Sequence, residues 1–271
     1  MQKVNQVEFL KLLKNEYLRQ PSSTLPNAFW KTGQGMKPQL ECFVEQDSKG
    51  TKKLVMRDFE NWIIYWDREG NFPVLSGPDK ERLRFALAHQ HYLSHFVESV
   101  DGASQQPFFR LSHSLRQVEA PILSDPLVFR VVDPKTELAD VAEIINLSYS
   151  WANYTKDVVE KWIHHPVYDP ALWVWVVDQE TNALAGLGIA EFDARIPEVS
   201  LEWIQVHPNY RKRGVGQAIV LELLHRSKQK EALFATVSGK QGDDSNPEGL
   251  YRRCGFEGSD VWWVLRRGED S

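Results

Sequence analysis

The chain has 271 residues, of which 42% are hydrophobic and 25% are charged, and its formal net charge is −5. This composition is typical of a soluble globular protein, and the length suffices for two modest domains. The acidic balance argues against nucleic acid as a partner, because nucleic-acid-binding proteins present a domain-wide excess of Lys and Arg. The apolar runs fall far short of the roughly 18 residues that a membrane span requires, so no membrane partner is expected either.

The first 20 residues lack the apolar block and the small-residue cleavage site of a secretory signal. They predict a surface helix instead. Its expected buried side is formed by Val7, Leu10, Leu13 and Leu18. Cys42 and Cys254 are the only cysteines, so a disulfide framework is not expected and a reducing cytoplasm is the expected compartment.

The N-terminal part of the chain reads as α+β and contains no recognisable chemical motif. Short strands are predicted at 39–45, 52–57 and 61–66, followed by a helix at about 79–98. Turn-forming residues gather at 100–107 and again at 116–126. We place the domain boundary near residue 122, which divides the chain into domains 1–122 and 123–271.

The C-terminal part shows clearer periodicity. The predicted elements are a strand at 126–133, a helix at 136–150 capped by Thr136, a helix at 155–164, strands at 172–178, 183–193 and 199–206, a helix at 214–230, a strand at 232–239, a helix at 246–256 and a strand at 261–267. The three successive strands joined by turns predict an antiparallel meander.

The stretch VHPNYRKRGVGQAIV, residues 206–220, joins a strand to a helix through Arg211, Lys212, Arg213, Gly214 and Gly216. The first N–H groups of a helix have no acceptor within the helix, and the helix dipole adds positive charge there. Glycine lets a phosphate approach the backbone, while Arg and Lys supply charge. The stretch therefore predicts a site for a small anion, and the alternative is a solvated basic turn.

The order of these elements resembles the GNAT superfamily of acyl-CoA-dependent N-acetyltransferases, over residues about 126–267. Arg211, Gly214 and Gly216 match the family's pyrophosphate loop, Arg/Gln-x-x-Gly-x-Gly/Ala, and LYRRCGF at 250–256 matches its closing helix. A P-loop motif is missing from the sequence, and a dinucleotide-binding loop would need a further glycine. The resemblance implies an α+β fold with a largely antiparallel mixed sheet. The N-terminal α+β domain would be an accessory domain or a degenerate copy of the same fold.

The resemblance also implies acetyl-CoA, or a similar acyl-CoA, as co-substrate, and no metal. Its pyrophosphate would bind the backbone N–H groups of residues Arg213, Gly214, Val215, Gly216 and Gln217. Its pantetheine arm would pair as an added strand with Ile204, Gln205 and Val206. His164 and His165 have no partners at metal-ligand spacing and are expected at a helix end.

Glu202 is the candidate general base, at the place on the strand where many family members carry a working glutamate. Strand alternation puts it on the face of Ile204 and Val206, which is an unusual place for a charge. A bulge in the strand, or partial burial, would reconcile the position with base catalysis. The alternative is an edge-strand glutamate paired with an arginine. The oxyanion is expected to bind a backbone N–H near Ile204.

Tyr251 is the candidate general acid, because proton transfer from a phenol to a thiolate is uphill by only about 2 kcal/mol. The alternative is that Tyr251 packs against the sheet. Asn246 is expected to cap the helix that carries it. Many family members have a cofactor-binding Asn seven residues before the tyrosine, but position 244 here is Asp. Asn246 either replaces that ligand or serves as the cap alone.

These residues predict a cytoplasmic N-acetyltransferase that transfers acetyl directly to an amine in a ternary complex. The acceptor, a small molecule or a peptide, stays open among aminoglycosides, polyamines, amino acids and protein N-termini. Its site is lined by Trp151, Tyr154, Trp162 and Trp203, unless these pack in the core. A homodimer is a possible assembly. The alternatives are a non-catalytic acyl-CoA-binding or sensing module, and a scaffold without a cofactor.

Overall fold

The computed structural model describes residues 1–71, 81–99, 104–148, 152–243 and 245–267. They form two units, unit 1 (Met1–Leu111, Ser238–Asp244 and Gly258–Ser271) and unit 2 (Ser112–Val237 and Ser245–Glu257). Both units are mixed α+β, which confirms the predicted fold class. The boundary near residue 122 stays a prediction about domains, because the chain returns to unit 1 after it has built most of unit 2.

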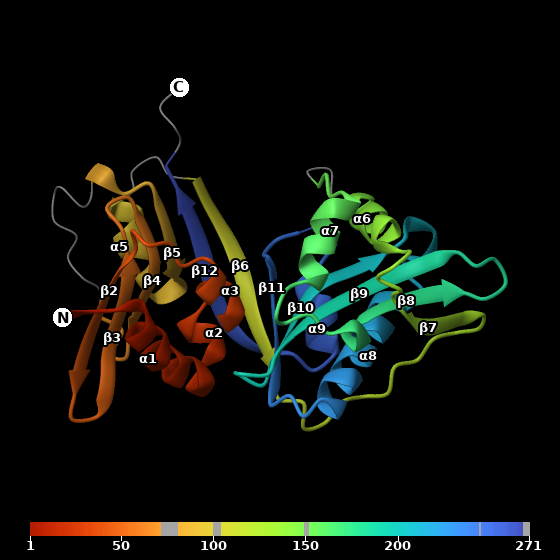
Figure 1. Ribbon diagram of the computed structural model, residues 1–271, viewed down its shortest axis with the longest axis horizontal. Helices are drawn as coiled ribbons and strands as arrows, with labels where there is room; N and C mark the ends of the chain where they lie inside the picture. Colours follow the sequence, from red (N-terminus) through yellow and green to blue (C-terminus); the bar gives the residue numbers. More distant parts are fainter. Residues whose placement is uncertain (72–80, 100–103, 149–151, 244, 268–271) are drawn as a thin grey trace. The chain divides into compact units, whose positions relative to one another are not determined.

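Unit 1 is built on a mixed sheet with the strand order β1-β2-β3-β4-β5-β12-β6 (Figure 1). Its elements are β1 (Gln2–Val4), α1 (Gln6–Arg19), α2 (Pro21–Thr24), α3 (Phe29–Gln34), β2 (Glu41–Asp47), β3 (Gly50–Arg57), β4 (Asn61–Asp67), β5 (Phe85–His89), the 3-10 turn η1 (Gln90–Tyr92), α5 (Leu93–Ser99), most of β6 (Ser104–His113) and most of β12 (Glu257–Arg266). Strands β1 to β4 pair antiparallel, β4 pairs parallel with β5, and β12 pairs antiparallel with β5.

The three strands predicted between residues 39 and 66 are confirmed as β2, β3 and β4. The helix predicted at about 79–98 is wrong over 85–92, where the chain forms β5 and a 3-10 turn. Ala86 and Ala88 are buried between β4 and β12, so pairing with distant strands overrides a helical local preference. The predicted turn segment at 100–107 overlaps the start of β6, and residues 100–103 lie outside the described part.

The N-terminal helix is confirmed as α1, but its predicted buried side is wrong except for Leu13. The buried residues are Phe9, Leu13, Glu16 and Tyr17, whereas Val7 is 80% exposed. Spacings of three and four residues place these four on one face, and the two aromatic rings bury more apolar area than Val7 and Leu18 would.

Unit 2 follows the predicted order of elements closely, on a sheet with the order β11-β10-β9-β8-β7. Its elements are β7 (Leu127–Val131), α6 (Leu138–Asn146), α7 (Lys156–Ile163), η2 (Pro170–Leu172), β8 (Trp173–Asp178), β9 (Leu184–Asp193), β10 (Glu198–Val206), η3 (Pro208–Tyr210), α8 (Val215–Gln229), most of β11 (Phe234–Lys240) and α9 (Pro247–Arg253). Strands β7 to β10 form the predicted antiparallel meander, and β11 lies parallel to β10.

The predicted cap of α6 is wrong. The Thr136 hydroxyl donates to Asp133 Oδ2 at 2.9 Å, and the helix begins at Leu138 after Glu137. Glu137 is held there because its carboxylate accepts hydrogen bonds from the Asp133 N–H and from the Trp175 indole. The predicted end of this helix, residues 149 and 150, lies outside the described residues.

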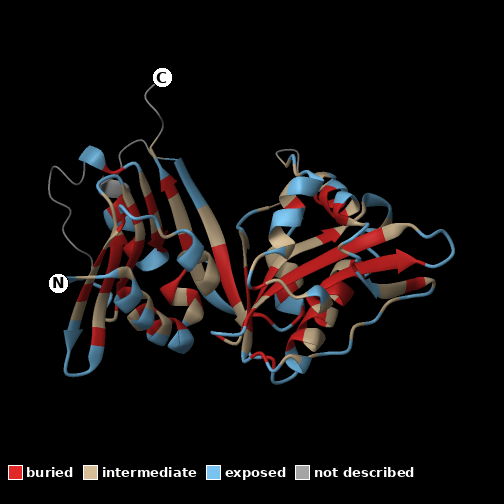
Figure 2. Cartoon of the chain, in the orientation of Figure 1, coloured by how far each residue is buried: buried red, intermediate tan, exposed pale blue. Residues whose placement is uncertain are grey.

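Helices cover both faces of the unit 2 sheet (Figure 1). Helices α6 and α7 pack on one face, over a core that includes Trp175, Leu187 and Ile189. Figure 2 shows how continuously β8 is buried beneath them. Helix α8 packs on the other face, where Gly186 and Gly188 of β9 let it approach the strand backbone.

We expect Gly188→Ala to destabilise unit 2 by about 1–3 kcal/mol, the usual cost of overpacking a well-filled core. A Cβ at this position would overlap Cγ2 of Ile219 in α8. The control is Gly216→Ala, whose Cβ would lie 3.5 Å from its nearest neighbours, an ordinary contact. Urea unfolding should separate the two variants, and equal stability would contradict this account of the helix packing.

Candidate active site

Strand β10 loses one of its two neighbours partway along its length. Its parallel ladder with β11 covers Glu198 to Ser200, whereas its antiparallel ladder with β9 continues to Val206. Within the described residues, the edge of β10 that faces away from β9 is therefore paired with β11 only at its beginning. Ile204, Gln205 and Val206, the predicted partners of the pantetheine arm, lie on the later part of this strand.

A bulge interrupts β10 at Glu202, which is one of the two arrangements that the charge on that strand suggested. Leu201 pairs with Ala190 and Trp203 pairs with Ile189, so Glu202 is the extra residue. Its Oε1 accepts a hydrogen bond from the Ser200 hydroxyl at 2.8 Å. Because Ser200 pairs with Glu191, two residues along β9 from Ile189, it lies on the face that α6 and α7 cover. The bulge thus moves Glu202 off the α8 face.

The basic loop presents its cations and its backbone to the outside. Arg211, Lys212, Arg213 and Gly214 are all exposed. Lys212 and Gly214 have left-handed φ angles of 62° and 79°, a backbone form that turns successive N–H groups toward a common point. Helix α8 then begins at Val215 with no side-chain cap on its first turn. The site therefore fits an anion that would accept hydrogen bonds from the N–H groups of the first turn of α8.

Two strand ends hold this loop in place. The Tyr210 hydroxyl donates to Asp178 Oδ2, at the end of β8, at 3.0 Å. The Arg213 guanidinium lies over the Tyr210 ring, 5.3 Å from its centroid. Arg211 Nε donates to the Val206 carbonyl, at the end of β10, at 3.2 Å. Arg211 thereby connects the predicted pyrophosphate loop to the predicted pantetheine strand.

Helix α9, which carries Tyr251, packs against the first turn of α8. Leu250 lies 3.5 Å from the place of a Cβ on Gly216, and Cys254 Sγ lies 3.9 Å from the Gln217 carbonyl oxygen. Tyr251 is 8% exposed, and its ring packs edge-on against Phe256. The loop, the end of β10 and α9 therefore meet around the start of α8.

Asn246 is confirmed as the cap of α9, since its side chain accepts the Gly249 N–H at 3.0 Å. Its role as a cofactor ligand stays a prediction. Asp244, the residue at the family's usual ligand position, lies outside the described part of the chain.

Three aromatic side chains gather on the α6–α7 face of the sheet. Trp162 and Trp203 are stacked with centroids 5.9 Å apart, and Tyr154 packs edge-on against both at 5.4 Å. They are partly buried and rest on the core of unit 2. Asn146 positions Tyr154 by hydrogen bonds to its backbone N–H and carbonyl. Trp151, the fourth predicted residue of this group, lies outside the described residues.

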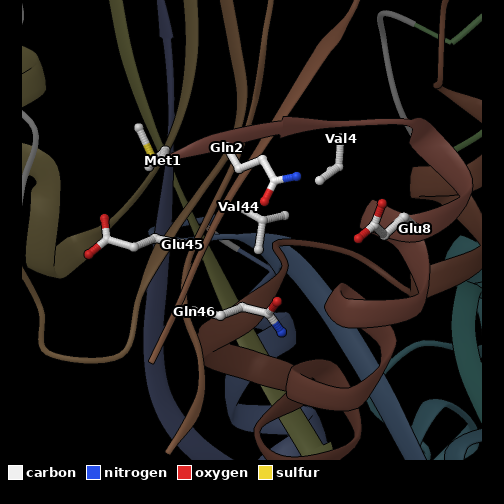
Figure 3. A pocket seen from close by; sticks show the side chains of 7 residues that line it. All are labelled: Met1, Gln2, Val4, Glu8, Val44, Glu45 and Gln46. Atoms are coloured by element: carbon white, nitrogen blue, oxygen red, sulfur yellow. The ribbon is translucent and has the colours of Figure 1, made fainter. Parts of the chain in front are cut away.

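Two pockets lie apart from the first turn of α8. One, of about 390 Å³, lies between α6 and α7 and includes Tyr154 and Asn146 in its lining. The other, of about 270 Å³, lies in unit 1 and is lined by residues of β1, α1 and β2, with Glu8 and Glu45 as its acidic side chains (Figure 3). Neither includes a residue of the basic loop or of α9.

The thiols of this chain are poorly suited to nucleophilic chemistry. Cys42 and Cys254 are free and buried, and burial raises the pKa of each to about 11. Among the described side chains, no group of three or more His, Cys, Asp or Glu residues is arranged to hold a metal ion. No helix in that part of the chain is long and apolar enough to cross a membrane.

Residues 170–258 match the family model described as the acetyltransferase (GNAT) domain. No curated protein matches the sequence. A GCN5-related N-acetyltransferase from Sphaerobacter thermophilus has a similar structure, with a TM-score of 0.66, 14% identity, and coverage of 89% of this chain and 86% of that one.

Two further solved structures resemble nearly the whole chain. A Drosophila protein gives a TM-score of 0.64 at 13% identity, covering 100% of this chain and 99% of its own. A tandem GNAT protein from the clavulanic acid biosynthesis pathway gives 0.60 at 12% identity, covering 99% and 98%. At such low identities these likenesses establish the fold, which is the one that the motifs predicted.

Proposed function

The chain carries an acetyltransferase domain of the GNAT family at residues 170–258, and from this premise we propose that it transfers acetyl from acetyl-CoA to an amine. The proposal rests mainly on one observation. Helix α8 begins without a side-chain cap, directly after three exposed cationic residues and Gly214. Bound there, acetyl-CoA would supply an activated thioester. The N–H groups of Val215, Gly216 and Gln217 and the side chains of Arg211 and Arg213 would hold its phosphates.

Arg213 would be aimed by Tyr210, and this gives a testable difference between two variants. We expect Tyr210→Leu to raise the Kd for acetyl-CoA about two- to fivefold, since a cation–π contact of an exposed arginine contributes roughly 0.5–1 kcal/mol. Tyr210→Phe keeps the ring and loses only the hydrogen bond to Asp178, so its Kd should rise less. Calorimetry would measure both constants. Wild-type affinity in Tyr210→Leu would mean that Arg213 does not depend on the ring.

Glu202 would act as the general base. Its half-buried carboxylate would accept the proton that the amine loses as nitrogen bonds to the acyl carbon. The Ser200 hydroxyl, which donates to Oε1, would orient the carboxylate for this transfer. A backbone N–H near Ile204 would stabilise the negative charge that develops on the acyl oxygen.

Tyr251 would donate its phenolic proton to the sulfur as the carbon–sulfur bond breaks. We expect Tyr251→Phe to lower kcat about 10- to 100-fold, in the lower range for general acids because a thiolate is a tolerable leaving group. The Kd for acetyl-CoA should change little. Stopped-flow single-turnover rates and calorimetry would separate the two effects. An unchanged kcat would leave Tyr251 with a packing role against Phe256.

The acceptor would approach from the α6–α7 face, where Tyr154, Trp162 and Trp203 lie. We propose an amine on a small molecule or a peptide, and no nucleic acid or membrane as partner. The two unpaired, buried cysteines favour a cytoplasmic compartment, and a homodimer is the assembly to test first.

The test is an acceptor panel of aminoglycosides, polyamines, amino acids and peptides, with thiol release from acetyl-CoA as the signal. Because Cys42 and Cys254 are buried with a pKa of about 11, they should react slowly with the thiol reagent and leave a low background. Release that depends on one amine class supports the proposal. Tight acetyl-CoA binding without turnover of any amine would favour the sensing module, and the lack of binding would favour a scaffold.

A further inference from the structure

Unit 1 repeats the order and pairing of elements seen in unit 2. In unit 1 a strand and helices precede the antiparallel strands β2, β3 and β4, and the parallel strand β5 is followed by α5 and β6. In unit 2 a strand and helices precede β8, β9 and β10, and the parallel strand β11 is followed by α9 and β12. The described strands of the two units therefore follow one topology, and the segment that corresponds to α8, between β4 and β5, lies mostly outside the described residues.

The repeat includes the bulge, and this aligns the two strands residue by residue. In unit 1, Met56 pairs with Ile64 and Arg57 with Trp62, so Ile63 is the extra residue of β4. Ile63 precedes the end of β4 by as many residues as Glu202 precedes the end of β10. An isoleucine thus stands where unit 2 has its candidate base, and it has no group that can accept a proton.

The same alignment pairs Asp67, the last residue of β4, with Val206. In unit 1 the ladder between β4 and β5 covers only Asn61 and Trp62. Further along the same edge of β4, the Tyr92 side chain takes the position that a neighbouring strand would occupy. The Tyr92 hydroxyl accepts a hydrogen bond from the Asp67 N–H at 3.2 Å and donates to the Asp67 carbonyl at 3.1 Å. Both main-chain groups that an added strand would use at Asp67 are therefore satisfied within the unit.

Tyr92 is built into this position. It is 5% exposed, and its ring packs edge-on against Tyr65 with centroids 4.9 Å apart. Burial raises the pKa of the phenol, so it stays protonated and able to donate. The Asp67 carboxylate turns away to an ion pair with Lys53 Nζ at 3.2 Å. The sequence 68–84 after β4 also lacks the Arg/Gln-x-x-Gly-x-Gly/Ala pattern.

We propose that unit 1 is a non-catalytic copy of the acyltransferase fold whose cofactor-facing strand edge is closed by its own Tyr92, so that each chain binds one acyl-CoA, in unit 2. This rests on the proposed function, since it takes acyl-CoA as the ligand of unit 2. Unit 1 would then have a structural role only, and unit 2 would carry out the acyl transfer.

Calorimetric titration of the full chain with acetyl-CoA gives the first test. We expect one site per chain, and we expect Gly216→Glu, which blocks the start of α8, to remove all measurable binding. Two sites in the wild type, or a remaining site in Gly216→Glu, would overturn the inference and leave the proposed function standing. Thermal unfolding of the variant would verify that it is folded.

Hydrogen exchange at single residues gives a second test that does not depend on turnover. Acetyl-CoA should slow exchange of the Val215–Gln217 amides and leave the Asp67 amide unchanged, and slowed exchange at Asp67 would contradict the closure. Without ligand, Tyr92→Phe should speed exchange of the Asp67 amide at least tenfold while other β4 amides keep their rates. If the wild type bound no acetyl-CoA, the proposed function would fail. An unchanged exchange rate of the Asp67 amide in Tyr92→Phe would separately overturn the proposal that Tyr92 closes the strand edge.

Discussion

Replacing Gly216 by glutamate is expected to weaken acetyl-CoA binding at least 100-fold, which corresponds to about 2.7 kcal/mol. Gly216 lies in the first turn of α8, where the backbone N–H groups have no partner in the helix. A glutamate there would begin 3.5 Å from Leu250 and Val206, and its carboxylate, held in the first turn, would repel the phosphate charge. The helix itself should tolerate the change, because a carboxylate near a helix N-terminus is favourable.

Gly216→Ala is the matched control for this result. Its methyl group would make ordinary contacts with Leu250 and Val206, and the family's loop pattern accepts alanine at this position. We expect its Kd for acetyl-CoA to stay within about tenfold of the wild-type value, a difference of less than about 1.4 kcal/mol. Calorimetry on both variants would measure the contrast. Equal affinity in Gly216→Glu and wild type would remove the start of α8 as the phosphate site.

Glu202→Gln is expected to lower kcat/KM roughly 100- to 10,000-fold, the range in which a positioned base contributes. The amide keeps the size of the carboxylate and can still accept from the Ser200 hydroxyl, so the bulge should persist. Binding of acetyl-CoA should not change. The difference in rate between the wild type and Glu202→Gln should shrink as the pH rises toward the pKa of the acceptor amine, because more of the amine is then neutral and needs no general base. A pH profile of single-turnover rates would measure this.

Ser200→Ala is the control that separates the carboxylate from its orientation. It keeps Glu202 and removes the hydrogen bond to Oε1, so we expect a smaller loss than in Glu202→Gln. Full activity of Glu202→Gln at neutral pH would contradict the assignment of Glu202 as the general base. A loss in Ser200→Ala as large as in Glu202→Gln would assign the main effect to the shape of the bulge.

The parts of unit 2 that could be predicted depend on signals carried by neighbouring residues. The buried stripe of α8, the cap at Asn246 and the glycines of the basic loop each act within a few residues of their own position. The bulge at Glu202 could be anticipated for a related reason, since a charge out of step with strand alternation suggests either a local change of register or partial burial, and the structure has the change of register.

What could not be predicted depends on residues far apart in the sequence. β5 is a strand because β12 pairs with it, with Trp262 opposite His89, and nothing near residue 89 indicates that partner. The anchor of the basic loop is of the same kind, since Asp178 and Tyr210 belong to different elements. The role of Tyr92 is also of this kind, because it depends on Asp67, 25 residues away, and on the matching bulges of β4 and β10.

The last strand of the chain lies between β5 and β6 in the sheet of unit 1. All of unit 2 is synthesised before residue 258, whereas unit 1, which leaves the ribosome first, completes its sheet only once β12 has been made. Until then β5 and β6 lack the strand that separates them, and exposed edges of this kind invite pairing with other chains. Unit 1 begins first and is completed last, so deleting β12 would damage unit 1 more than unit 2.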